Sequence, residues 1–324
     1  MSATASLVDD LLAGKHRALA RTITKIENRS PGYRELVSQL HAHTGDAEVV
    51  GVTGSPGAGK STLVDQMAKV YRDQGFTVGV IAVDPSSPYT GGAVLGDRIR
   101  MASTVGDMDV FFRSMSARGS LGGLSTATAD AVKALDAFGK DKIIIETVGA
   151  GQNEIDIVRT ADTVAVLVPP ASGDDIQMLK AGILEIGDVF VVNKADLDGA
   201  DRTVQELKEM IHMRDSDDDW EPLVVETIAK SGEGIAEFLD ALSEHYAYLE
   251  DSGRLEEKAR TRYAEEIRAL LRADIGSLIS EEVEDQGGIE ALVDEVVARE
   301  ADPYTIADRI MEPLEDCVSE RRQS

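Results

Sequence analysis

The sequence predicts an α/β fold in which a mostly parallel central sheet is flanked by helices, with helical extensions at both ends. Two observations support this prediction. From residue 48 to about residue 248, short apolar runs suited to buried strands alternate with helical patterns, as in parallel sheets covered on both faces. After the first apolar run, residues 54–61 read GSPGAGKS, which fits the phosphate-binding loop G-x-x-x-x-G-K-[ST]. Together they predict a P-loop NTPase.

Residues 1–45 are expected to form an N-terminal helical extension. Leu7, Val8 and Leu11 share one helical face, Leu36 and Leu40 share another, and a Ser-Pro-Gly break separates the two runs.

The nucleotide-binding domain is expected to span residues 46–250. Its predicted strands are 49–52, 77–83, 142–146, 163–168, 189–193 and 223–226, and its predicted helices are 62–74, 126–138, 176–186, 201–213 and 235–248. The strands are short and apolar, as expected where both faces of a sheet are covered.

The strand patterns stop at about residue 251, and residues 251–324 are expected to be helical, with helices over 256–271 and 289–299. An amphipathic helix that covers no sheet must bury its apolar stripe elsewhere, often on a second subunit. We therefore expect this region to mediate a homodimer.

The composition argues against several classes of protein. The chain has 33 Lys and Arg against 59 Asp and Glu, so its net charge is −26, the opposite sign from a typical nucleic-acid binder. No apolar run is long enough for a membrane span, and the first 25 residues lack a signal-peptide core. The single cysteine, Cys317, suits a reducing cytoplasm. We expect a cytoplasmic protein that binds neither nucleic acid nor membrane.

The phosphate-binding loop lies between a strand end and a helix start, where backbone N–H groups and the helix dipole favour a phosphate. Lys60 is expected to reach the β- and γ-phosphates, and the Ser61 hydroxyl to bind Mg²⁺. The expected nucleotide-binding residues here are Gly54, Ser55, Pro56, Gly57, Ala58, Gly59, Lys60, Ser61 and Thr62.

A second motif, N-K-A-D at residues 193–196, follows a predicted strand and favours GTP over ATP. Because an ionised carboxylate only accepts hydrogen bonds, Asp196 can take both the ring N–H and the exocyclic amine of guanine. Asn193 can tie the loop down, and the Lys194 stem can cover the base. A short loop expected to touch the guanine carbonyl consists of Ile228, Ala229 and Lys230, with Ile228 where P-loop GTPases usually have Ser.

Three acids are candidates for the Mg²⁺ site that phosphoryl transfer needs. Asp84 and Glu146 each follow a predicted strand, and Asp97 lies in a Gly-rich segment. Each could instead cap a helix or lie in a solvated loop, although a strand end on the phosphate side favours function for Asp84 and Glu146.

Taken together, these residues resemble the MeaB/ArgK-type GTPases over essentially the whole chain. The matching motifs are 51–62, 83–88, 91–101, 118–124, 146–154, 173–182 and 193–196. Departures are modest: Ile228 in the base loop, and Ala150 where Val is common.

The resemblance implies a slow, Mg²⁺-dependent GTPase that works as a homodimer. It also implies a chaperone of adenosylcobalamin-dependent methylmalonyl-CoA mutase, which gates cofactor loading and protects or repairs the mutase. No Asp-x-His-x-x-Gly cobalamin motif occurs, so we expect any cobalamin to be held by the mutase and not by this chain.

The resemblance also assigns roles by position. Asp84, Asp97 and Glu146 match family acids near Mg²⁺ and the γ-phosphate, and residues 84–97, 146–154 and 169–180 match three switch segments. Lys180, in the third switch, joins Lys60, Asp97 and Glu146 as a candidate catalytic residue. Candidates for an activating arginine are Arg98, Arg113 and Arg118, each of which could instead pair with a carboxylate.

Three other functions stay open. An ATPase or kinase accessory of lysine/arginine/ornithine transport is opposed by the guanine-type pair Asn193 and Asp196. A nickel-type GTPase metallochaperone is weakened because no Cys/His cluster lies near the switches. A scaffold that does not hydrolyse GTP is the last.

The dispersed acidic charge predicts a protein adapted to a salt-rich cytoplasm. Carboxylates spread along the chain repel one another unless salt screens them. We therefore expect the melting temperature to rise as KCl is added, measured by circular dichroism at constant pH. A melting temperature that stays level or falls would refute the hypothesis.

Overall fold

The computed structural model describes residues 3–85, 107–117, 123–147, 157–170, 183–213 and 219–323. Within these residues, a seven-stranded sheet runs in the order β3-β2-β4-β1-β5-β6-β7, and every neighbouring pair is parallel. The strands are β1 Glu48–Gly54, β2 Val78–Pro85, β3 Val110–Ala117, β4 Lys142–Thr147, β5 Thr163–Val168, β6 Val189–Asn193 and β7 Leu223–Thr227. The predicted α/β class is confirmed.

Strand β1 lies in the middle of this sheet and is buried along its whole length. The chain leaves β1 to build β2, β3 and β4 on one side and then crosses to build β5, β6 and β7 on the other. In open parallel sheets such a switch point opens a crevice at the carboxyl ends of the strands, where ligands bind. The phosphate-binding loop follows β1 at this point.

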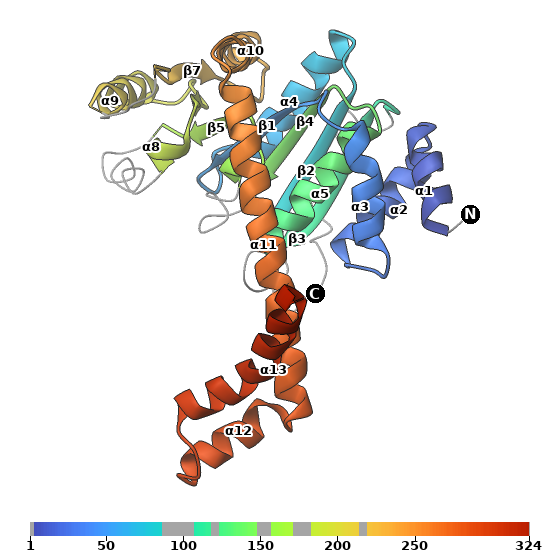
Figure 1. Ribbon diagram of the computed structural model, residues 1–324. Coiled ribbons are helices and arrows are strands. Elements are labelled where there is room, and N and C mark those ends of the chain that lie inside the picture. The colour runs from blue at the N-terminus through green and yellow to red at the C-terminus, as the bar shows by residue number, and fades with distance from the viewer. Residues whose placement is uncertain are drawn as a thin grey trace. The chain divides into compact units, whose positions relative to one another are not determined.

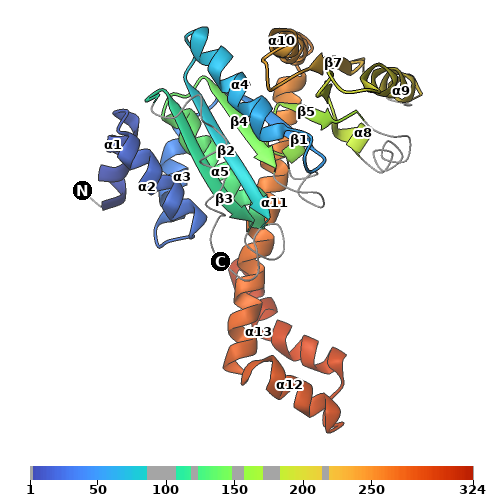
Figure 2. The same ribbon diagram turned by 180° about the vertical axis from the view of Figure 1, so that it is seen from behind.

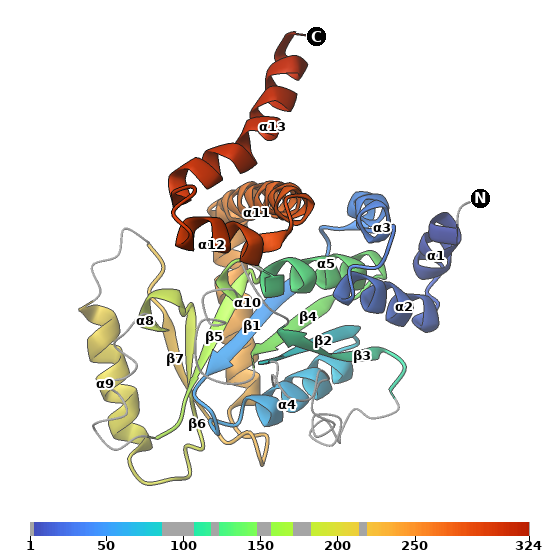
Figure 3. The same ribbon diagram turned by 90° about the horizontal axis from the view of Figure 1, so that it is seen from below.

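Helices cover both faces of the sheet. The described helices are α1 Ala3–Leu12, α2 His16–Glu27, α3 Tyr33–Leu40, η1 His41–His43, α4 Lys60–Asp73, α5 Gly123–Ala137, α8 Ile183–Ile186, α9 Ala200–His212, α10 Ile235–Asp251, α11 Arg254–Asp285, α12 Gly288–Val297 and α13 Pro303–Gln323. One core cluster joins one face to α4 and α10, and a second joins the opposite face to α5 and α9 (Figures 1 and 3). Helices α1 to α3 pack outside α5 and share its core (Figure 2).

Some elements differ from the prediction. The edge strand β3 was not predicted, because its polar and aromatic residues do not form the apolar run that marks a buried strand. Helix α11 continues to Asp285, well beyond the predicted end at residue 271, and α13 was not predicted. Within the predicted helix 176–186, only the turn Ile183–Ile186 lies in the described residues.

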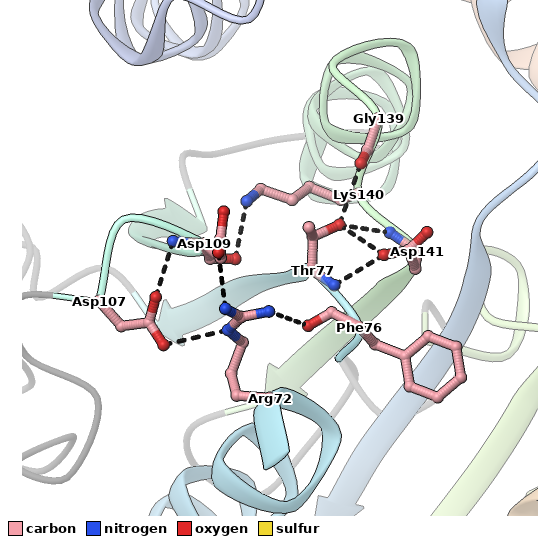
Figure 4. Close-up of polar contacts among 8 residues, drawn as sticks. All are labelled: Arg72, Phe76, Thr77, Asp107, Asp109, Gly139, Lys140 and Asp141. Atoms are coloured by element: carbon pink, nitrogen blue, oxygen red, sulfur yellow. Dashed lines mark hydrogen bonds and ion pairs between the residues drawn. The ribbon is translucent and has the colours of Figure 1, made fainter. Parts of the chain in front are cut away.

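Polar contacts join the amino ends of β2, β3 and β4 (Figure 4). Arg72, in the last turn of α4, pairs with Asp107 at 3.0 Å and with Asp109 at 2.6 Å. The backbone N–H of Asp109, and then the Arg72 guanidinium, hold the pKa of Asp107 below its usual value. Thr77 and Asp141 exchange further hydrogen bonds between the starts of β2 and β4. The helix that begins at the phosphate loop is thus fixed at its far end.

The chain divides into two compact units, Met1–Arg262 and Tyr263–Ser324. The first contains the sheet, the described helices that precede α11, and the first turns of α11. The second has a small core of Leu292, Ile306 and Ile310, against which Ile279 and Val296 pack. Among the described residues, no helix has both the length and the apolar character that crossing a membrane requires.

Gly51 in β1 allows a close approach that a larger residue would block. A Cβ atom at this position would lie 2.7 Å from Cγ1 of Ile157 and 3.0 Å from Cβ of Ala161. We expect Gly51→Ala to lower the free energy of unfolding by about 1–3 kcal/mol, since overpacking a close-packed core forces neighbours to move. Urea denaturation measures this change.

The control is a double-mutant cycle with Ile157→Ala, which removes the nearest atoms. The double variant should be more stable than the sum of the two single effects predicts. Strict additivity of the two changes would contradict the steric explanation.

Candidate functional site

The phosphate-binding loop leaves β1 at a glycine that no other residue could replace without strain. Gly54 has φ +135°, and a Cβ atom there would lie 2.2 Å from the carbonyl oxygen of Leu167 in β5. At the other end of the loop, Gly59 has φ +96° and precedes the first residue of α4, with no side chain capping that helix. The first turn of α4 therefore presents its N–H groups to the loop, an arrangement that suits a phosphate.

Lys60 begins α4 and folds back over the loop. Its ammonium group donates to the carbonyl oxygens of Gly54 at 2.6 Å and Ser55 at 3.0 Å. The side chain is buried, with 7% of the residue exposed. The loop thus surrounds a positive charge that could pair with phosphate oxygens.

Ser61 and Glu146 meet where β1 and β4 end side by side. Glu146, in register with Val52 of β1, is 4% exposed, and its Oε1 accepts a hydrogen bond from the Ser61 hydroxyl at 2.6 Å. An ionised carboxylate only accepts, so Ser61 donates its proton and keeps its oxygen lone pairs for another partner. A hydroxyl oxygen and a carboxylate are oxygen ligands of the type that Mg²⁺ prefers, so the pair fits this ion.

The amide of Asn193 joins three segments of the chain. Its Nδ2 donates to the carbonyl oxygen of Ala58 in the phosphate loop at 2.7 Å. Its Oδ1 accepts from the Thr227 hydroxyl at 3.1 Å and from the Ala229 N–H at 3.0 Å. Asn193 is 2% exposed, and a Cβ atom at Gly59 would lie 2.4 Å from its Nδ2. Only a glycine at position 59 leaves room for this amide.

The rest of the N-K-A-D motif lies at the surface beside this junction. Lys194 donates to the carbonyl oxygen of Gly57 at 2.8 Å and adopts φ +63°, an uncommon conformation outside glycine. Asp196 and Lys230 are exposed, whereas Ala229 is buried. The Ala229 N–H, in the segment expected to touch the guanine carbonyl, is bonded to Asn193. The phosphate loop and the expected base-binding segments thus form one connected edge.

The structure leaves several predicted residues undescribed. Asp97 and Lys180 lie outside the described residues, as do most of the three switch segments, and Asp84 is described only by its backbone at the end of β2. Of the three candidate arginines, Arg98 and Arg118 also lie outside. Arg113 pairs with Glu27 of α2 at 2.5 Å, the structural alternative considered for it.

Three threonines contribute to the site although no motif singled them out. Thr227 directly follows the predicted strand 223–226, and its hydroxyl helps to orient Asn193. Thr53 and Thr147 share a buried hydrogen bond of 2.9 Å between the ends of β1 and β4. Their signal was weak because Thr is common in strands whatever its function.

Comparison with known proteins agrees with this geometry. Residues 19–284 match the family model of the methylmalonyl-CoA mutase-associated GTPase MeaB. A Pyrococcus abyssi protein described as a GTPase is 48% identical over 312 residues, which cover 95% of this chain and 96% of that one. The GTPase ArgK of Escherichia coli is 35% identical over 273 residues, 82% of each chain. A crystal structure of an LAO/AO transport system kinase superposes with a TM-score of 0.71 at 25% identity, covering 96% and 97% of the two chains.

The Asn193 junction generates a test of the site. Asn193→Ala removes three hydrogen bonds and leaves the buried Ala229 N–H without this acceptor, an orphan that costs about 1–3 kcal/mol. We expect GTP affinity to fall at least about tenfold, since that cost falls on the nucleotide-binding edge. Titration with a fluorescent GTP analogue measures the affinity.

Thr227→Val is the matched control, because it removes only one bond to the same amide. It should weaken binding far less than Asn193→Ala. Equal losses in the two variants would show that the link to the phosphate loop is unimportant.

Proposed function

Because the chain belongs to the MeaB family of methylmalonyl-CoA mutase-associated GTPases, we propose that it is a GTP-driven chaperone of an adenosylcobalamin-dependent methylmalonyl-CoA mutase. In this role it would gate cofactor loading and protect or repair the mutase. The fold and the relatives named as GTPases both identify the chain as a P-loop GTPase. The family match carries the proposed link to the mutase.

We propose that Lys60, Ser61 and Glu146 perform the central chemistry. The Lys60 ammonium would bind β- and γ-phosphate oxygens, exchanging its present carbonyl partners for charged ones. Ser61 would ligate Mg²⁺ while Glu146 holds its proton, with Asp84 and Asp97 as further candidate acids. When bound, Mg²⁺ would neutralise charge on the β- and γ-oxygens as the terminal phosphate leaves. Lys180 remains a proposed contributor from the third switch.

The proposed guanine site consists of Asn193, Lys194 and Asp196, with Ile228, Ala229 and Lys230 beside it. The exposed position of Asp196 supports this role, because its carboxylate is accessible to the base edge of a nucleotide. The buried amide of Asn193 would hold the phosphate loop and the base-binding segments in one arrangement.

We also propose that the chain forms a homodimer through α11. Five apolar side chains three or four residues apart on this helix are each between 44% and 58% exposed: Tyr263, Ile267, Leu271, Ile275 and Leu278. Residues at this spacing share one side of a helix, and a second copy would cover them. Sedimentation as a monomer at micromolar concentration would contradict this proposal.

One alternative has support in a comparison. The superposed crystal structure is of an LAO/AO transport system kinase, so the second candidate function is that of an ATPase or kinase accessory of lysine/arginine/ornithine transport. The two functions differ in the nucleotide used, since an accessory of transport is expected to bind ATP instead of GTP. ATP displacing bound GTP at equal concentration would favour it.

Asp196→Asn tests the guanine assignment. Replacing the carboxylate with an amide substitutes a donor for an acceptor, which opposes the two donors of guanine and suits the additional carbonyl of xanthine. We expect GTP affinity to fall at least about a hundredfold and XTP affinity to rise, since a site that loses matched polar partners rejects the ligand strongly. Competition binding with both nucleotides measures the change.

Asp198→Asn is the matched control, because Asp198 is an exposed acid two residues further along the same loop. It should leave GTP affinity unchanged. A parallel loss in both variants would point to the charge of the loop and not to base recognition.

The proposed partner predicts a change in turnover. The full chain alone should hydrolyse GTP slowly, and the addition of an adenosylcobalamin-dependent methylmalonyl-CoA mutase should accelerate hydrolysis at least about tenfold by stabilising the transition state. Phosphate release measured with and without the mutase tests this, with Lys60→Ala as the inactive control. Equal rates in the two conditions would refute the coupling.

A further inference from the structure

The first turns of α11 are bonded to the segment that enters β5. Lys258 donates to the carbonyl oxygen of Asp162 at 2.8 Å. One guanidinium nitrogen of Arg262, Nη1, donates to Oδ1 of Asp162 at 2.7 Å and to the carbonyl oxygen of Thr160 at 3.1 Å. We call Thr160, Asp162, Lys258 and Arg262 the α11 clamp.

Asp162 also binds β1, the strand that ends in the phosphate loop. Its Oδ2 accepts from the Val49 N–H at 2.9 Å, and its own N–H donates to the Val49 carbonyl at 2.8 Å. Asp162 is 3% exposed, so both carboxylate oxygens bind their partners away from bulk water. A single buried carboxylate therefore links α11 to β1.

Residues 157–162 are held to β1 by packing as well. Ile157 and Ala161 lie so close to Gly51 that a Cβ atom on that glycine would approach them within 3.0 Å. This segment follows residues 148–156, which overlap the second switch expected from the family resemblance. Any shift of the 157–162 segment along β1 must move the carbonyl of Thr160 and the carboxylate of Asp162, and both are bonded to Arg262.

All four clamp residues belong to the first compact unit, of which Arg262 is the last residue. Helix α11 continues beyond Arg262 to Asp285. The Asp162 side chain is 5% exposed and that of Arg262 is 26% exposed, so separating the pair would leave a nearly buried carboxylate without its charge partner. The clamp thus ties the start of α11 to the segment between the expected second switch and β5.

We propose that the α11 clamp is a conformational link by which the nucleotide bound at the phosphate loop alters α11. The proposal rests on the proposed GTP site. GTP in place of GDP shifts residues 157–162, and Arg262 passes this shift to the helix. By thermodynamic reciprocity, a partner that holds α11 changes the affinity of the chain for the two nucleotides. Arg262 is a positioning residue in this scheme and contacts no nucleotide.

Amide hydrogen exchange of the full chain tests the link. The chain is compared with GDP and with a non-hydrolysable GTP analogue, and exchange is followed in peptides from the phosphate loop, from 157–163 and from 254–275. We expect exchange in all three regions of the unmodified chain to differ between the two nucleotides. In Arg262→Gln, the difference in α11 should be lost while that in the phosphate loop remains.

Two further variants separate coupling from general damage. Arg260→Gln is the matched control, because Arg260 is exposed and forms its ion pair along its own helix, with Glu256. It should keep the α11 response. Arg262→Lys retains a cationic donor for Asp162 and should restore part of the response. Protection of β1 and β6 in each variant, read in the same experiment, verifies that the fold is intact.

The outcomes are distinct. The link is overturned if the α11 response survives Arg262→Gln. It is also overturned if the unmodified chain shows no α11 response while its phosphate loop responds. Either result leaves the proposed GTP site standing. A phosphate loop that responds to neither nucleotide overturns the proposed GTP site and the link together.

Discussion

The buried amide of Asn193 is the interaction on which the nucleotide edge depends. A parallel sheet brings the carboxyl ends of its strands to one edge, but it does not by itself hold the loops there in a fixed arrangement. Asn193 does so by donating to the phosphate loop and accepting from β7 and the segment after it. Because Gly59 has no side chain, it leaves room for this amide. The Asn193 amide and the glycine at position 59 together determine how the phosphate and base regions meet.

At the opposite edge of the sheet, polar contacts hold the two elements that flank the phosphate loop. There, Arg72 fixes the far end of α4, the helix that begins with Lys60. Asp162 fixes the start of β1, the strand that ends at Gly54. The loop between this strand and this helix therefore has both of its flanking elements anchored away from the site. At this edge, the charged groups of Arg72 and Asp162 hold the scaffold around the site.

Much of the fold could be read from the sequence because the central strands are apolar throughout and the two nucleotide motifs follow strands. The predicted order of strand, phosphate loop and helix around Lys60 is confirmed. Strand β3 escaped prediction because an edge strand needs only one neighbour and tolerates polar residues such as Arg113. The sequence could suggest that Asn193 secures a loop, but not that Thr227 and Ala229 complete its hydrogen bonds. Such contacts depend on residues far apart in the chain, and no local pattern encodes them.

Helix α11 has a geometric property that follows from its length and from the place where it is held. It continues for 23 residues beyond Arg262 to Asp285, a span of about 35 Å at 1.5 Å per residue. Displacement along a straight helix grows with distance from the point where it is held, so a tilt of about 5° would displace a point about 35 Å away by about 3 Å. The end of the helix farthest from the clamp would therefore move most for a given tilt.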